Sequence, residues 1–201
     1  MNALKKKRIK TVMKYTWPFY IVAMVIIILF MDFIFGVTHR LPSYKMITLF
    51  VSGDVKDYVA LRDDLLEEYE EKELQVVSTI SSYPNESQYN AKLTVSGYAS
   101  ADIFIIPVST LDTLRVASFA LQLNEEIIAT YYQDYTLYQK DEEKYGVKLD
   151  KEKVKQYMSL PNEECYMLLN FGSDNIGQYA LKPNQEHDTA LQLVKKWGCN
   201  V

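Results

Sequence analysis

The sequence has few of the residues on which most catalytic and metal sites depend. Its 201 residues include two cysteines, Cys165 and Cys199, and two histidines, His39 and His187. It contains no glycine-rich phosphate loop and no G-x-S-x-G, H-E-x-x-H or C-x-x-C motif. A serine nucleophile would need His187 as its base, and no serine is marked for that role. We therefore expect no enzyme, no cofactor and no metal site. A hydrolase that depends on His187 is the last of the alternatives.

Glycine and proline are also scarce, with seven and six residues, and there is no low-complexity tract. Most of the chain should therefore be ordered. The charge is uneven. The first 16 residues carry six positive charges and no negative one, which leaves 16 positive against 26 negative charges in the rest. A remainder with a net charge of 16 − 26 = −10 argues against binding of nucleic acid or anionic lipid.

The one long apolar run, WPFYIVAMVIIILFMDFIFGV at residues 17–37, organises the rest of the chain. About 21 residues span roughly 30 Å as a helix, the thickness of a bilayer core. The basic residues before it predict a cytoplasmic tail at 1–16, a single transmembrane helix at 17–37 and an extracytoplasmic remainder at the cell membrane. A cleaved signal peptide is the alternative, but the run is long and no A-x-A site follows. Asp32 fits interfacial hydration or, alternatively, a cationic partner helix.

The remainder predicts a linker at 38–45 and one α/β domain at 46–201. Three nearly continuous apolar runs, at 46–51, 74–80 and 101–107, alternate with helical patterns. This alternation favours a three-layer lobe with a mostly parallel sheet. Further along we expect a fourth strand at 165–170, a short fifth strand at 175–181 and a last helix at 188–197.

Two features of the domain leave alternatives open. Cys165 and Cys199 could form a disulfide outside the cell, or both could be small buried residues. The tyrosines of the polar stretch between Tyr131 and Tyr145 could build a sugar-stacking surface or cover a sheet edge, and we prefer the second interpretation.

Open α/β sheets place ligands at the carboxyl ends of their parallel strands. The loops expected there contain serine, glycine, aspartate and tyrosine, which offer hydroxyl, backbone and carboxylate groups to a ligand. Asp54 also suits the N-cap position of the following helix, where a carboxylate accepts from free backbone N–H groups. The candidate ligand-binding residues at this edge are Ser52, Gly53, Asp54, Ser81, Ser82, Tyr83 and Ser109.

Several passages, taken together, resemble the first lobe of extracellular solute-binding proteins of ABC importers, particularly the sugar-type ones. The resemblance covers most of 45–135 and, more loosely, 165–197. It implies a periplasmic-binding-protein-like lobe, and it matches Asp102 to the family's aspartate at the start of a strand. That carboxylate would either contact a ligand or make structural hydrogen bonds. The matching passages are 47–54, 66–70, 74–80, 89–93, 100–107, 119–127 and 187–197.

The chain departs from this family in ways that bear on function. Family members are usually about twice as long, and a second lobe closes over the ligand. In Gram-positive bacteria they are usually lipoproteins, whereas this chain is predicted to span the membrane. A single lobe offers only one wall to a small ligand. We therefore expect a membrane-anchored, non-enzymatic domain that binds a partner, such as an ABC permease or another membrane protein. A working receptor for a sugar or peptide is the alternative.

Overall fold

A computed structural model describes residues 3–38 and 41–200, and the side chains of 16–32, 34 and 41–200. The chain divides into two compact units, Met1–Leu41 and Pro42–Val201. The second unit contains the whole sheet and both parts of the hydrophobic core, so every site considered below lies within it.

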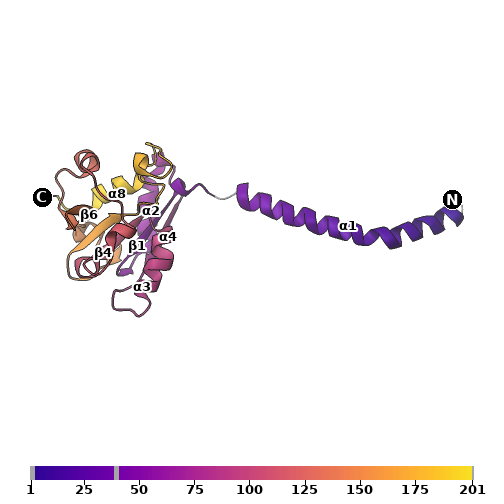
Figure 1. The fold of residues 1–201 in the computed structure, drawn as a ribbon, viewed down its shortest axis with the longest axis horizontal. Helices are drawn as coiled ribbons and strands as arrows, with labels where there is room; N and C mark the ends of the chain where they lie inside the picture. The colour runs from indigo at the N-terminus through magenta and orange to yellow at the C-terminus, as the bar shows by residue number, and fades with distance from the viewer. Residues whose placement is uncertain (1–2, 39–40, 201) are drawn as a thin grey trace. The chain divides into compact units, whose positions relative to one another are not determined.

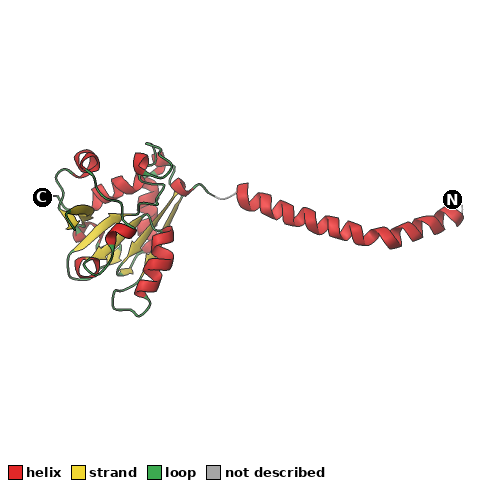
Figure 2. Ribbon diagram, in the orientation of Figure 1, coloured by secondary structure: helices red, strands yellow, loops and turns green. Residues whose placement is uncertain are grey.

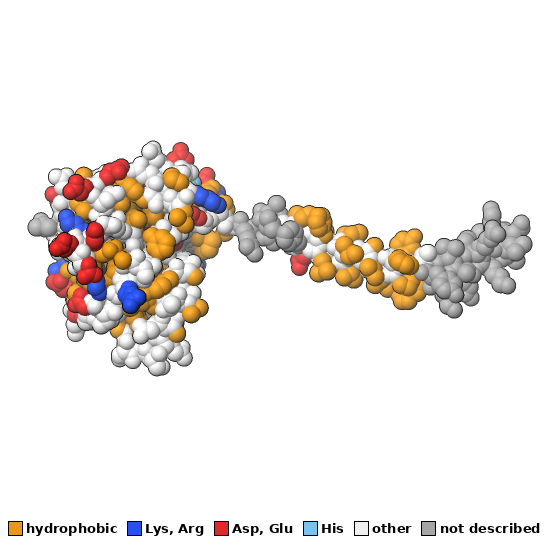
Figure 3. Space-filling view, in the orientation of Figure 1, with side chains coloured by type: hydrophobic (Ala, Val, Ile, Leu, Met, Phe, Trp, Pro, Cys, Tyr) orange, Lys and Arg blue, Asp and Glu red, His pale blue; other side chains and the backbone are white. Residues whose placement is uncertain are grey.

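The first unit is dominated by one helix, α1 (Ala3–Thr38), which contains Pro18 (Figure 1). Most of the predicted tail at 1–16 is therefore helical. Apolar side chains between Trp17 and Met31 are exposed along α1 (Figure 3). Among the residues that the structure describes, no helix is both long and apolar enough to cross a bilayer. In the segment predicted at 17–37, the side chains at 33 and 35–37 lie outside the described part, and the membrane anchor stays a prediction.

The second unit is built around a six-stranded sheet with the strand order β3-β1-β4-β8-β6-β5 (Figure 2). A separate two-stranded ribbon pairs β2 with β7. The strands are β1 (Met46–Val51), β2 (Asp54–Val55), β3 (Val76–Ser81), β4 (Ile103–Pro107), β5 (Leu137–Lys140), β6 (Glu143–Lys148), β7 (Met158–Ser159) and β8 (Cys165–Leu169).

The helices cover both faces of the sheet, so the unit has three layers, as the apolar runs predict (Figure 1). Strand β4 illustrates the cause. Ile103 and Ile105 pack into one core cluster, whereas Phe104 and Ile106 pack into the other. The helices and helical turns are η1 (Ser43–Lys45), α2 (Tyr58–Glu68), η2 (Glu70–Lys72), α3 (Tyr89–Lys92), η3 (Leu93–Gly97), α4 (Tyr98–Ser100), α5 (Val108–Leu111), η4 (Val116–Ser118), α6 (Glu125–Ile127), η5 (Ile128–Tyr132), α7 (Lys151–Val154), η6 (Gly177–Tyr179) and α8 (Thr189–Trp197).

The sheet is mixed rather than mostly parallel. Strand β1 pairs in parallel with β3 and β4, but β8 runs antiparallel to both β4 and β6, and β5 runs antiparallel to β6. The hairpin between β5 and β6 explains part of the difference, because a connection of two residues can join only antiparallel strands. The strand expected at 175–181 is also wrong, since only the short turn η6 forms there.

The tyrosine-rich stretch belongs to the sheet and its core. Strands β5 and β6 extend the sheet beyond β8, and Tyr132, Tyr138 and Tyr145 are buried. The rings of Tyr138 and Tyr166 lie 5.3 Å apart. Buried rings cannot stack on a sugar, so the structure favours the edge-covering interpretation for these three side chains.

The last helix, α8, forms where the sequence places it. Ala190, Leu191, Val194 and Trp197 are all buried, as the helical spacing predicts. The local sequence is sufficient to place this helix, because its wide hydrophobic stripe is visible in the spacing of neighbouring residues.

Candidate functional site

The parallel strands bring the candidate residues of three loops to one edge of the sheet. Val51 at the end of β1 is paired with Ser81 of β3 and with Ile105 of β4. Ser52 and Ser82 therefore leave the sheet on the same side, and Ser109 follows β4 there in α5. The prediction that these loops meet rests on the parallel half of the sheet, which is the half that the sequence identified.

Ser52 is enclosed at this edge. Its side chain is fully buried, and its Oγ lies 2.7 Å from the hydroxyl oxygen of Tyr89. Its backbone N–H donates to the carbonyl of Ile105 at 2.9 Å. Burial raises the pKa of Tyr89 to about 12, so this phenol remains protonated at neutral pH. The hydroxyl and the N–H of Ser52 are therefore both used within the fold.

The serines after β3 are also used by the fold. Ser82 is buried, and its hydroxyl donates to Glu86 Oε2 at 2.7 Å. Lys92 donates to the carbonyl of Ser81 and to the same Glu86 oxygen, each at 3.4 Å. The hydrogen bond from Ser82 is the main reason why the pKa of Glu86 lies below its ordinary value. Tyr83, the next residue, is 38% exposed.

Gly53 and Asp54 lead into the ribbon of β2 and β7. A Cβ atom on Gly53 would lie 2.4 Å from the carbonyl oxygen of Ser159, so only glycine fits this close approach. Asp54 is exposed and pairs with Ser159 in the ribbon. The expectation that Asp54 caps the following helix is wrong. Asp57 caps α2 instead, with its Oδ1 accepting from the N–H of Ala60 at 2.9 Å, because β2 moves the helix start along the chain.

Ser109 is held by an acidic side chain from the segment just before β8. The N–H of Ser109 donates to Glu163 Oε2 at 3.1 Å, and its hydroxyl donates to Glu163 Oε1 at 2.8 Å. The structure thus gathers the candidate serines at one edge and gives each an internal partner. Asp54, Tyr83 and Ser109 are the candidates there that are exposed, and of these Ser109 is bound to Glu163.

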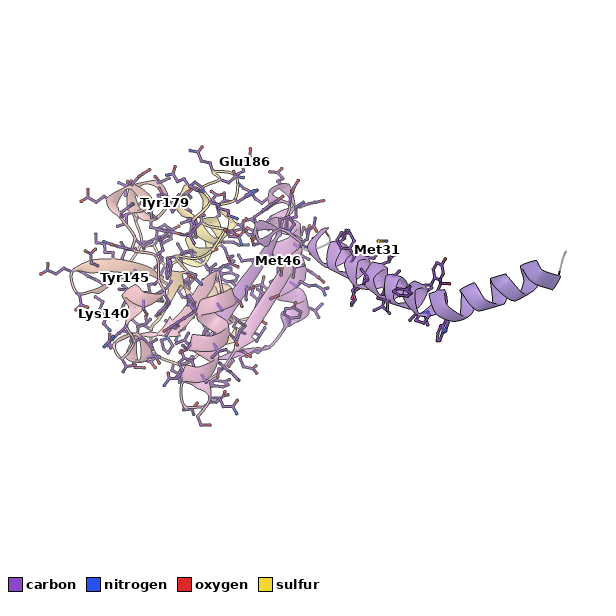
Figure 4. All side chains as sticks on the ribbon, turned by 45° about the vertical axis from the view of Figure 1, so that its right-hand side comes forward. Met31, Met46, Lys140, Tyr145, Tyr179 and Glu186 are labelled. Atoms are coloured by element: carbon purple, nitrogen blue, oxygen red, sulfur yellow. The ribbon has the colours of Figure 1, made fainter. Side chains whose placement is uncertain are left out.

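Asp102 directly precedes β4 and is 9% exposed, so it lies at the opposite, amino edge of the parallel strands, where β1 begins with Met46 (Figure 4). Its carboxylate accepts from the N–H of Thr48 at 2.8 Å, from the hydroxyl of Ser173, and from Asn175 Nδ2 at 3.2 Å. Burial raises the pKa of Asp102 to about 6, against the lowering effect of these hydrogen bonds. The strand-start aspartate therefore joins β1, β4 and the loop after β8.

Sequence reasoning missed the partners of Asp102. Asn170 and Asn175 are buried, and Asn170 Nδ2 donates to the carbonyls of Tyr98 and Ala101 at 3.1 and 2.6 Å. A signal was present in the run Asn-Phe-Gly-Ser-Asp-Asn directly after β8. Side chains of this kind form local turns and bond to backbone groups. The pairing with Asp102 crosses about 70 residues, so only the fold reveals it.

The sequence leaves open whether the two cysteines form a disulfide or are both small buried residues. Cys165 and Cys199 are both free, and Cys165 is buried. The carbonyl of Cys165 accepts from Leu149 N–H, whereas Cys199 N–H donates to Lys148. The segment at 148–149 therefore lies between the two cysteines and separates them. Among the described residues, no group of three or more His, Cys, Asp or Glu side chains could hold a metal ion.

Comparison with known proteins adds little to this geometry. No protein-family model matches the sequence, and no curated protein matches it. Among solved structures, the fold is similar to the maltose/maltodextrin-binding domain MalE from Bdellovibrio bacteriovorus bound to maltotriose, with a TM-score of 0.37 and 13% identity. The match covers 52% of this chain and 28% of that chain. A likeness at this level carries no argument about function. What the structure shows on its own is a mixed α/β unit with a six-stranded sheet.

Proposed function

We propose that this chain is a non-enzymatic accessory domain that binds a partner protein at the outer surface of a cell. The lobe would derive from a solute-binding ancestor, and α1 would tether it to the membrane. The tether rests on the basic residues of the first 16 positions and on the exposed apolar side chains of α1.

The internal use of the serines at the carboxyl edge carries this proposal. Ser52 and Ser82 are buried, and each hydroxyl already has a partner in Tyr89 or Glu86. A ligand that displaced these bonds would leave buried polar groups unpaired, at a cost of about 1–3 kcal/mol for each group. The edge is therefore poorly suited to capture a small solute, and a single lobe supplies one wall only. A protein partner needs no enclosed cavity, and it can use the exposed Asp54 and Tyr83 instead.

Two measurements on the full chain in detergent micelles separate this role from that of a solute receptor. Calorimetry with maltotriose and a panel of other sugars and peptides should give no saturable heat. A photo-crosslinking aromatic residue in place of Tyr83 should give one discrete adduct in cells. The same residue in place of Phe171, which is 48% exposed in the loop after β8 at the other edge, is the control and should not give that adduct. Saturable sugar binding without a Tyr83 adduct would establish the receptor and refute the accessory role.

The tether has its own test. The full chain should sediment with membranes, whereas the second unit alone, residues 42–201, should stay in solution after expression with a separate export signal. If both forms fractionate in the same way, α1 is not the anchor.

A further inference from the structure

The loop that follows β8, residues 170–175, is held in place by hydrogen bonds rather than by apolar contacts. Leu169 and Ile176 anchor its two ends in the hydrophobic core. Between them, the only apolar side chain is that of Phe171, which is 48% exposed. A segment with so few buried apolar groups can open locally while the rest of the domain stays folded.

The hydrogen bonds of this loop converge on the carboxylate of Asp102. The hydroxyl of Ser173 donates to Asp102 Oδ1, and Asn175 Nδ2 donates to the same oxygen at 3.2 Å. The N–H of Asn175 donates to Ser173 Oγ at 3.0 Å, so these two residues are bound as a unit. Asn175 also joins the loop to β1 and α8, through the carbonyl of Met46 and the N–H of Ala190. The ionisation of this one carboxyl therefore bears on how firmly residues 173–175 are held.

The closed loop encloses this carboxyl without a cation. A pocket of about 420 Å³ borders Asp102, and the titratable side chains among its described lining residues are Tyr98, Asp102 and Asp174. The ion pairs formed by the described residues include neither carboxylate. Burial raises the pKa of Asp102 to about 6, and the charge of Asp174 adds to this effect, so the hydrogen bonds offset burial only in part. The ionised carboxyl is therefore less stable under the closed loop than it would be in water.

A second polar group of the loop would also gain from opening. Oδ1 of Asn175 is buried and has no hydrogen-bond partner among the described residues. The opposite assignment of this amide would place its oxygen against the carbonyl of Met46, which is an acceptor, so the observed assignment is favoured. In an open loop, water would bind this oxygen. The unmet acceptor is a geometric observation that is separate from the charge on Asp102, and it too favours a loop with two arrangements.

We propose that residues 171–175 form a pH-sensitive clasp, which is closed when Asp102 is protonated and opens more often when Asp102 is ionised. The clasp also reaches the start of the domain, because the hydroxyl of Ser43 in η1 donates to Asp174. The closed loop therefore holds η1, β1 and β4 together at the amino edge of the sheet. When it opens, water hydrates the Asp102 carboxylate. The clasp lies at the other edge from Tyr83, so it does not depend on the accessory role proposed above.

The test measures amide hydrogen exchange by NMR on the full chain in detergent micelles, with each rate divided by the intrinsic rate of an unfolded peptide at the same pH. The informative groups are the N–H groups of Ser173 and Asn175, which bond inside the loop. Opening returns the carboxyl from a pKa of about 6 toward its ordinary 3.8. The opening constant should therefore rise by about tenfold between pH 5 and pH 7.5. Low concentrations of urea should not alter this exchange, because local opening exposes little surface.

Matched variants assign the pH dependence to one carboxyl. Asp102→Asn should abolish it in the loop, because the amide does not ionise, whereas Asp54→Asn, which removes an exposed charge at the opposite edge, should keep it. Near-ultraviolet circular dichroism checks folding. If Asp102→Asn does not fold, the carboxyl carbon resonance of Asp102 in the parent decides the result, because its titration midpoint must coincide with that of the loop exchange.

Three results would overturn the proposal. The first is protection at Ser173 and Asn175 that does not change between pH 5 and pH 7.5. The second is a change that persists in Asp102→Asn, or whose midpoint differs from that of the Asp102 carboxyl. The third is the same pH and urea dependence in the amides of β4, since the loop would then open only when the whole domain unfolds.

Discussion

Asp102 makes a specific prediction about how the stability of the domain depends on pH. The side chain is 9% exposed, and its partners are an N–H group, a hydroxyl and an amide, all uncharged. Burial is the main cause of its raised pKa. Substitution by asparagine keeps nearly the same shape and removes the charge. The comparison of the two proteins at each pH therefore isolates the ionisation of this one carboxyl.

The magnitude follows from the difference between the folded and unfolded pKa values. The pKa rises from an ordinary 3.8 to about 6 in the folded protein, a difference of about two pH units. Since one pH unit corresponds to about 1.4 kcal/mol, the linked free energy is about 3 kcal/mol. The folded state binds the proton more tightly. The contribution is therefore fully present below about pH 4 and is lost as the pH rises through about 6.

The assay is urea unfolding of residues 42–201 between pH 4 and pH 7.5, with Asp102→Asn measured alongside. We expect the free energy of unfolding of the parent to fall, relative to the variant, by about 2 kcal/mol as the pH rises across this range, because the unfolded carboxyl is already partly ionised at pH 4. Glu86→Gln serves as a control of opposite sign, because the pKa of Glu86 is lowered and its contribution is lost as the pH falls. A constant difference between the parent and Asp102→Asn, or a difference that grows toward low pH, would refute the reasoning.

Three further predictions concern the fold. Asp141 and Glu142 form the turn between β5 and β6, with φ values of 51° and 68°. Because glycine adopts a positive φ without strain, Glu142→Gly should raise the free energy of unfolding in urea by about 0.5–1 kcal/mol. A lower unfolding midpoint would contradict this. Gly53→Ala should separate β2 from β7, visible as faster amide exchange at Lys56, whose N–H donates to the carbonyl of Tyr157, with the central strands unchanged. Leu61→Ala, in the core, should lower the free energy of unfolding by about 2–5 kcal/mol. Val59→Ala, at an exposed position of the same helix, should lower it by less than about 0.5 kcal/mol. Equal losses would mean that the packing of α2 is misassigned.

The sequence determined the elements whose signal is local. The run that forms β4 is apolar at consecutive positions, which predicts a strand that is covered on both faces. In the structure, Ile103 and Phe104 pack into opposite core clusters. The spacing from Ala190 to Trp197 likewise predicts α8. Both signals need only a few neighbouring residues, because the side chains of a strand alternate and those of a helix repeat about every 3.6 residues.

The candidate site was predictable only in part. The rule that loops meet at the carboxyl ends of parallel strands placed Ser52 and Ser82 at one edge. It could not show that their hydroxyls are already paired, because Tyr89 lies 37 positions from Ser52 and no local pattern links Glu86 to Ser82. In the structure α3 begins at Tyr89, and 85–88 form turns that bring Glu86 back to Ser82.

What the sequence by itself determined is therefore the α/β class, the three layers, the parallel half of the sheet and the acidic character of the domain. Only the tertiary structure decided the direction of β8, the separation of the two cysteines and the partners of Asp102. The physical reason is the range of the interactions. Strand direction depends on the path of the chain between strands, and the bonds of Asp102 join residues from about 54 to 73 positions away, a distance over which no local pattern carries information.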